Sequence, residues 1–107
     1  MAWIYLIIAG VFEVVWAMGL KLSNGFSKVY PSIVTVVGML ISLYFLSAAV
    51  KILPIGTAYA IWTGIGAAGA VIMGIILFDE PKTLARFIFL GLIIIGMIGL
   101  KAVSGEK

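Results

Sequence analysis

Glu13 is the residue whose type and position most clearly indicate chemistry. It stands near the middle of residues 2–20, an otherwise apolar run long enough to cross a lipid bilayer. A charged side chain at that depth costs roughly 2.5–3.5 kcal/mol on insertion scales, so such residues usually serve a function. An apolar setting favours the neutral acid, whereas an arriving cation favours the carboxylate. A proton and a cation therefore compete for this group, which is the minimum requirement for their exchange.

A second interpretation of Glu13 is structural: a neutral carboxyl group hydrogen-bonded to a neighbouring helix. On a helix, Trp16 follows Glu13 by one turn on the same face. The face of an indole ring attracts cations, so we interpret Trp16 as one wall of a cation site. The alternative is a tryptophan that only packs against other helices or faces lipid.

The composition indicates an integral membrane protein. Of the 107 residues, 64% are hydrophobic and 10% charged, whereas a soluble domain has about half apolar and about a quarter charged residues. There is thus too little polar surface to cover a water-soluble fold. The chain lacks cysteine and histidine, which excludes disulfides, thiolate nucleophiles and imidazole bases. We expect no enzyme activity, no cofactor, no metal site and no nucleic-acid partner.

Four long apolar segments predict an all-α integral membrane fold, with a single transmembrane domain over residues 1–107. At ~1.5 Å per residue, each segment spans the ~30 Å hydrocarbon core as a helix. Irregular backbone cannot face lipid, and short connections make successive helices antiparallel. The expected helices are about residues 2–20, 31–50, 57–78 and 84–103, followed by a polar tail from Ser104 to Lys107.

The basic residues predict no single orientation in the membrane. Lys and Arg concentrate in cytoplasmic loops, and this bias sets topology. With four spans, three basic residues lie on the side of both termini and four on the other. They are Lys51, Lys101 and Lys107 against Lys21, Lys28, Lys82 and Arg86. This near balance favours dual topology, with two opposed copies paired as an antiparallel homodimer. The alternative is one orientation fixed by acidic residues or by lipid.

The second and third segments hold candidate residues for the wall of a Glu13 site. Ser42 lies near mid-membrane, where its hydroxyl group bonds either its own helix or Glu13. Tyr59 and Trp62 lie one turn apart on one face of the third segment. We therefore expect these aromatic rings to act together.

Glycines in the third and fourth segments predict two further features. Gly64 and Gly66 either soften the third helix so that it bends between states or let other helices pack closely. The fourth segment has no polar residue at depth, and Gly91, Gly96 and Gly99 predict the dimer contact. A second copy would also supply a second acid and more wall for the site.

Three features make the chain resemble the small multidrug resistance family of four-helix, proton-coupled exporters. They are the first-helix acid Glu13, the connection KLSNGF at residues 21–26, and PIGTAYAIWTGIG at residues 54–66. Within the family, GVFEVVWAMGLK at residues 10–21 resembles the guanidinium-exporter subtype. In the polyaromatic-drug subtype, glycine is typical at the position of Trp16.

The resemblance implies an antiparallel homodimer, multi-pass in the bacterial inner membrane, that exchanges protons for guanidinium by alternating access. Small substituted guanidinium ions are further candidate substrates. Glu13 would be the shared proton and substrate site. Ser42 and Trp16 would hydrogen-bond and orient its carboxyl group. Tyr59 and Trp62 would line the pocket.

The chemistry of guanidinium agrees with these residues. The ion is planar and always charged, and it matches a carboxylate in a forked geometry. The bulk of Trp16 leaves a small, flat site. The alternatives are a broad-specificity exporter of quaternary ammonium or polyaromatic cations and a membrane scaffold that transports nothing.

Overall fold

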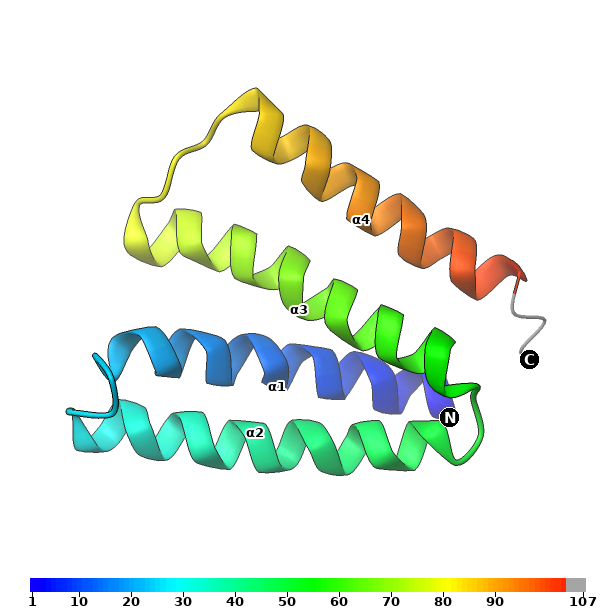
Figure 1. Ribbon diagram of the computed structural model, residues 1–107, viewed down its shortest axis with the longest axis horizontal. Helices are drawn as coiled ribbons and strands as arrows, with labels where there is room; N and C mark the ends of the chain where they lie inside the picture. The colour runs from blue at the N-terminus through cyan, green and yellow to red at the C-terminus, as the bar shows by residue number, and fades with distance from the viewer. Residues whose placement is uncertain (104–107) are drawn as a thin grey trace.

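The computed structural model describes residues 1–103, which form four helices that alternate in direction along the chain (Figure 1). Each helix is long and apolar enough to cross a membrane. The predicted all-α fold with four spanning helices is confirmed. The predicted polar tail, Ser104 to Lys107, lies outside the described residues. The helices are α1, Ala2–Leu22; α2, Val29–Val50; α3, Ile55–Phe78; and α4, Leu84–Val103.

Three helix ends lie two residues beyond their predicted positions, because prolines and lysines do not stop a helix where we expected. α2 begins at Val29, so Pro31 occupies its first turn, where the missing N–H has no helical partner to lose. α3 begins directly after Pro54, whose carbonyl accepts the Ala58 N–H at 3.0 Å. α1 continues through Lys21, whose cation favours a helix C-terminus.

A tight turn around Ser23 returns α2 against α1. The Ser23 side chain is fully buried; its Oγ donates to the Leu20 carbonyl at 2.7 Å and accepts the Phe26 N–H at 3.0 Å. Asn24, Gly25 and Phe26 all have positive φ, between +49° and +73°. The left-handed conformation is uncommon for non-glycine residues. The two bonds of Ser23 thus hold the backbone in a conformation that it would not choose alone.

α1 is the central helix and packs between α2 and α3, which contact each other much less than each contacts α1 (Figure 1). Small residues allow the close approach of α1 and α2. A Cβ atom added to Gly19 would lie 2.8 Å from Thr35 Oγ1, and one added to Gly38 would lie 3.2 Å from Trp16 Cβ. The backbone of each helix thus faces side chains of the other.

α4 packs on α3 and exposes most of its apolar surface, with Leu90 as its buried residue. A Cβ atom added to Gly91, Gly96 or Gly99 would meet no atom within 4 Å. The glycine-bearing face of α4 is therefore uncovered in a single chain. Its assignment as the dimer contact stays a prediction.

The connection between α3 and α4 begins with a left-handed residue, Asp79, at φ +53°. The Glu80 N–H then donates to the Gly74 carbonyl at 3.3 Å, as in a Schellman helix end. The Glu80 side chain lies on the Gly74 backbone and pairs with Arg86 at 3.2 Å. This ion pair joins the end of α3 to the first turn of α4.

Candidate functional site

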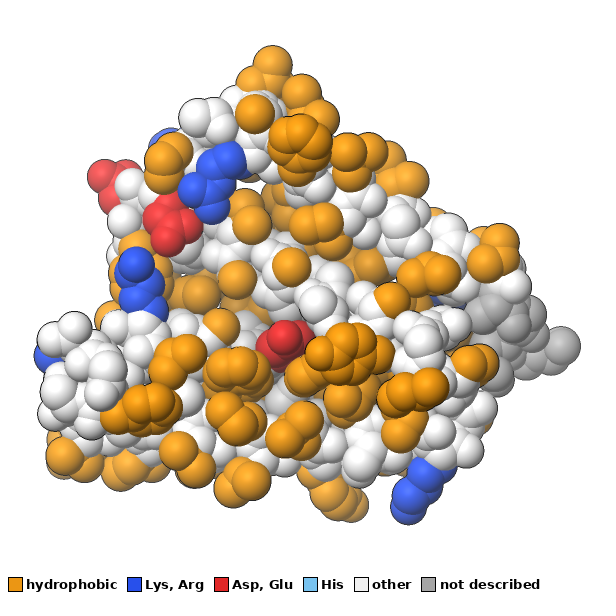
Figure 2. Space-filling view, in the orientation of Figure 1, with side chains coloured by type: hydrophobic (Ala, Val, Ile, Leu, Met, Phe, Trp, Pro, Cys, Tyr) orange, Lys and Arg blue, Asp and Glu red, His pale blue; other side chains and the backbone are white. Residues whose placement is uncertain are grey.

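Glu13 lies where α1 faces the middle of α3. A Cβ atom added to Gly66 would overlap the carboxyl group of Glu13, so that group rests directly on the α3 backbone. Its Oε1 atom is buried and accepts no hydrogen bond from any described residue. Figure 2 shows one acidic group isolated among apolar side chains near the middle of one face. Within the four helices, Glu13 is the one acidic residue.

The other charged groups of the described chain lie near helix ends. Lys21 Nζ lies 5.2 Å from the centre of the Phe78 ring, and Lys101 Nζ lies 5.2 Å from the centre of the Trp3 ring. Both contacts join different helices and keep the cation beside an aromatic face. No cation of these helices therefore reaches the depth of Glu13, where an external cation would be the natural partner of its carboxylate.

Ser42 of α2 forms hydrogen bonds to both α1 and α3. Its contact on α1 is Ala9, one helical turn before Glu13. Its Oγ donates to the Ala9 carbonyl at 2.6 Å and accepts the Trp62 Nε1–H at 2.9 Å. In an α-helix the carbonyl of Ala9 also faces the N–H of Glu13, four residues later. The chain of bonds from Trp62 through Ser42 to Ala9 therefore fixes the part of α1 that carries the acid.

The predicted hydrogen bond from Ser42 to Glu13 is not formed in this structure. A serine hydroxyl has one proton, and here the Ala9 carbonyl accepts it. Bonding of Ser42 within its own helix, the alternative, is not found either. Sequence reasoning missed the Ala9 carbonyl, because every residue carries such an acceptor and only the helix packing selects one.

Trp16 lies against α2, where it packs on Gly38. Its Nε1–H is buried and has no hydrogen-bond acceptor among residues 1–103, so the predicted bond to Glu13 is likewise not formed here. Glu13 Oε1 and Trp16 Nε1 are thus an acceptor and a donor, one helical turn apart, that are both buried and unpaired. Buried polar atoms are usually paired, and unpaired ones often mark sites where a ligand or a second conformation supplies the partner.

Tyr59 and Trp62 lie together on one face of α3, with ring centroids 5.3 Å apart. Their burial differs, because Trp62 is 9% exposed and Tyr59 is 53% exposed. Trp62 belongs to the hydrophobic core and donates its indole N–H to Ser42. Tyr59 extends the same aromatic surface outward from the core.

The glycines of α3 face different partners. A Cβ atom on Gly64 would come within 2.6 Å of Met97 Sδ in α4, whereas Gly66 faces Glu13 and Gly69 faces Val14. α3 is one continuous helix through all three. Close packing therefore explains these glycines, and bending of α3 at Gly64 and Gly66 stays a prediction. The contact of Gly66 with Glu13 was not predicted, although a glycine-rich run opposite a buried acid is a signal for it.

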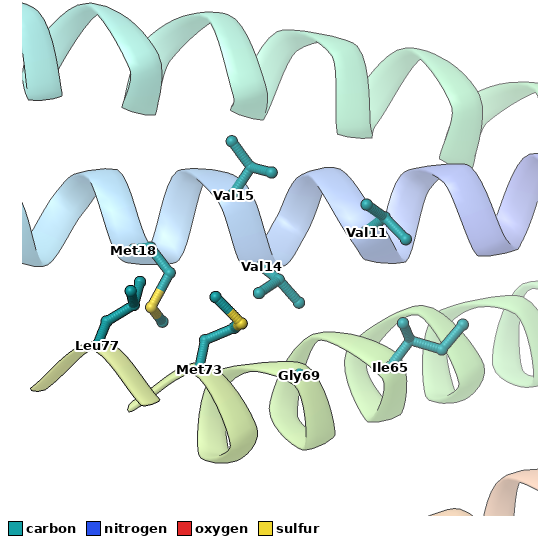
Figure 3. A pocket seen from close by; sticks show the side chains of 8 residues that line it. All are labelled: Val11, Val14, Val15, Met18, Ile65, Gly69, Met73 and Leu77. Carbon is teal, nitrogen blue, oxygen red and sulfur yellow. The ribbon is translucent and has the colours of Figure 1, made fainter. Parts of the chain in front are cut away.

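A separate apolar cavity of about 480 Å³ lies between α1 and α3. Val14, Met18, Ile65 and Met73 are among the side chains that line it (Figure 3). In Figure 3, α1 runs from right to left as in Figure 1, but α2, α1 and α3 follow in the reverse vertical order, so Figure 3 views the opposite face of the molecule. None of the lining side chains is titratable. Residues 1–103 contain no cluster of three metal-ligating side chains.

Comparison with known proteins decides the family. A family model described as "Small Multidrug Resistance protein" matches residues 1–93. The chain belongs to the small multidrug resistance family. The family resemblance seen in the sequence is thereby confirmed.

Similar members of the family are guanidinium exporters. One from Yersinia pseudotuberculosis is 59% identical over 104 residues, which cover 97% of this chain and 100% of the relative. One from Salmonella typhimurium is 60% identical over 101 residues, covering 94% and 96% of the two chains. One from Citrobacter freundii is 56% identical over the same length and shares.

Membership of this family and the four apolar helices make the protein a multi-pass protein of the bacterial inner membrane. Since the relatives are named as exporters, the protein is a transporter and not an enzyme. The predictions of class and location are confirmed. The roles assigned to individual site residues stay predictions.

Proposed function

We propose that the protein exports guanidinium in exchange for protons, by alternating access in an antiparallel homodimer. The supporting observation is the carboxyl group of Glu13, which lies at membrane depth with a buried, unpaired oxygen atom. The relatives that are 56–60% identical and named guanidinium exporters favour guanidinium as the cation.

Exchange follows because the Glu13 carboxyl group binds either a proton or a guanidinium ion, but not both at once. A neutral acid is tolerated at this depth, and so is a carboxylate paired with guanidinium in a forked arrangement. An unpaired carboxylate is costly there, because no cation of the helices lies close enough to compensate it. The empty, ionised site therefore resists reorientation, and each passage carries either a proton or a guanidinium ion.

The setting of Trp16 favours a small, flat cation. The backbone and Cβ of Trp16 lie directly against Gly38 of α2, so α1 and α2 approach each other closely beside this residue and leave little room for a large substituent. The indole face contributes a cation–π contact, and its unpaired Nε1–H is available to a carboxylate that turns toward it. Guanidinium fits such a site better than a polyaromatic cation does.

Two features of the single chain favour a second copy. Glu13 is only partly buried by its own chain. The glycine-bearing face of α4 is uncovered as well. In a bilayer, a partner chain over these surfaces would shield the acid from lipid and complete the wall of the site.

Flux measurements in proteoliposomes test this function. With an acidic lumen, protons leave as guanidinium enters, so we expect gradient-driven uptake that Glu13→Gln reduces to the level of protein-free vesicles. Absence of such uptake, or full uptake by Glu13→Gln, would contradict the proposal. A parallel assay with tetrapropylammonium separates the broad-specificity alternative, which requires preference for the bulkier ion. A scaffold would transport neither.

A further inference from the structure

The conformation of Glu13 depends on the absence of a side chain at residue 66. A Cβ atom there would overlap Oε1 and Cδ of Glu13 and would lie 2.9 Å from its Cγ. Non-bonded atoms essentially never approach a Cβ so closely, and the helix backbone of α3 cannot yield as a flexible side chain can. Any residue other than glycine at position 66 would therefore expel the carboxyl group from its present place.

This place suits a neutral carboxyl group and not an ionised one. Oε1 is buried against the α3 backbone and has no donor within hydrogen-bond distance. α2 and α3 contain no charged residue, and Lys21, the other charged side chain of α1, lies over the ring of Phe78 at the helix end. The titratable tyrosine nearest along α3, Tyr59, packs on Trp62. Nothing from the packed elements compensates an anion here.

We infer that Gly66 forms a proton-specific seat for Glu13: the neutral acid rests on the α3 backbone, and the carboxylate leaves this seat to bind the cation. Gly66 is then a positioning residue that favours the proton over guanidinium. The inference rests on the proposed proton–guanidinium exchange. It assigns the proton and guanidinium to two different positions of the Glu13 side chain.

If Gly66 forms this seat, Gly66→Ala should change the pH dependence of guanidinium binding in a specific direction. Gly66→Ala removes the place of the neutral acid but leaves the outward position of the carboxylate untouched. Protons then compete less well with guanidinium, so guanidinium stays bound to a lower pH than in the wild type. Overpacking of this size predicts a shift of about tenfold in the proton concentration that displaces half of the bound guanidinium.

Gly69→Ala is the matched control. Gly69 lies three residues further along the same face of α3, and a Cβ atom there would overlap Val14 Cγ2 but not Glu13. It disturbs the same α1–α3 contact without touching the acid. A purely structural effect would therefore appear in both variants, whereas the displaced pH dependence is expected in Gly66→Ala alone.

The experiment is a guanidinium titration of each purified variant at a series of pH values, followed by tryptophan fluorescence or calorimetry. Identical pH dependence for Gly66→Ala and wild type, or an equal shift in Gly69→Ala, would overturn the inference and leave the proposed function intact. If wild-type guanidinium binding does not depend on pH, then the proposed exchange itself fails and the seat with it.

A second measurement needs no altered glycine, in case Gly66→Ala does not fold. A protonated carboxyl group without hydrogen bonds has a higher infrared C=O stretching frequency than a hydrogen-bonded one. We expect acidified wild-type protein to show the higher-frequency band, and Glu13→Gln to lack it. A Glu13 band at the lower, hydrogen-bonded frequency would contradict the seat.

Discussion

Two buried polar bonds at Ser42 govern how rigidly the acid-bearing part of α1 is held. Ser42→Ala would leave the Trp62 indole N–H buried without an acceptor. It would also remove the hydrogen bond that the Ala9 carbonyl accepts from Ser42. A buried unsatisfied donor costs about 1–3 kcal/mol, so we expect a loss of unfolding free energy in that range. Unfolding in a denaturing detergent, followed by tryptophan fluorescence, measures it.

The control at the residue scale is Ser47→Ala. The Ser47 hydroxyl is exposed and bonds only the Tyr44 carbonyl of its own helix, at 2.7 Å. Exposed substitutions usually change stability by less than about 0.5 kcal/mol. Equal stability of Ser42→Ala and Ser47→Ala would show that the buried bonds to Ala9 and Trp62 contribute nothing.

The position of the acid could be predicted at this scale, but its partners could not. Glu13 stands out because a lone charge in an apolar run is energetically conspicuous in any arrangement of the helices. The bond from Ser42 to the Ala9 carbonyl depends on how α2 is shifted along α1, and no local pattern encodes that shift. The unpaired Nε1–H of Trp16 has the same origin, because only the packing of the helices decides which acceptors lie within its reach.

At the scale of the elements, the register of α3 on α1 depends on matched small and large residues. Gly69 accommodates Val14, and Gly10 accommodates Ile65, whose Cγ2 would lie 2.5 Å from an added Cβ atom. Gly69→Ala should cost about 1–3 kcal/mol of unfolding free energy through overpacking. Val14→Ala in the same chain should recover part of this loss, because it removes the methyl groups that clash.

A double-mutant cycle in the same detergent assay measures this coupling. Gly56→Ala serves as the control, since a Cβ atom there meets nothing within 4 Å. We expect a favourable interaction between the two substitutions of at least about 0.5 kcal/mol, the usual range for residues in contact. Strict additivity would mean that α1 and α3 do not pack in this register.

The helices themselves were predictable because length and hydrophobicity decide them, whereas the turns were not. The left-handed turn at Asn24, Gly25 and Phe26 includes two residues that rarely adopt positive φ. Its stability comes from the buried hydroxyl of Ser23, a tertiary feature. Asp79 similarly ends α3 in a left-handed conformation, supported by the bond from the Glu80 N–H to Gly74.

At the scale of the whole molecule, the charged residues within 1–103 other than Glu13 lie in two groups, at opposite ends of the bundle. The end that carries the α1–α2 turn and the α3–α4 connection includes the Glu80–Arg86 ion pair and Lys21 over Phe78. The opposite end includes the α2–α3 connection and Lys101 over Trp3. The membrane-spanning part between them offers no cation, so the positive-inside rule predicts the orientation from the small difference in basic residues between the two ends.

Dual topology has a direct test in a single cysteine on the α1–α2 turn. The chain contains no cysteine of its own. Ser23 is unsuitable because it is fully buried, but Ser27 is exposed. With an impermeant maleimide on intact cells, we expect about half of the Ser27→Cys chains to react, and the rest only after permeabilisation. Labelling of all chains, or of none, from outside would contradict dual topology.

The count of basic residues on the two sides of the membrane predicts which substitution would impose a single orientation. Lys51→Gln leaves two basic residues on the side of both termini against four on the other, so the α1–α2 turn should become cytoplasmic in most chains. Ser27→Cys in that background should then escape external labelling. If function requires opposed copies, guanidinium efflux should fall as well and return when a variant of the opposite bias is co-expressed. Efflux that survives uniform orientation would show that one orientation suffices, and the antiparallel dimer would have to be abandoned.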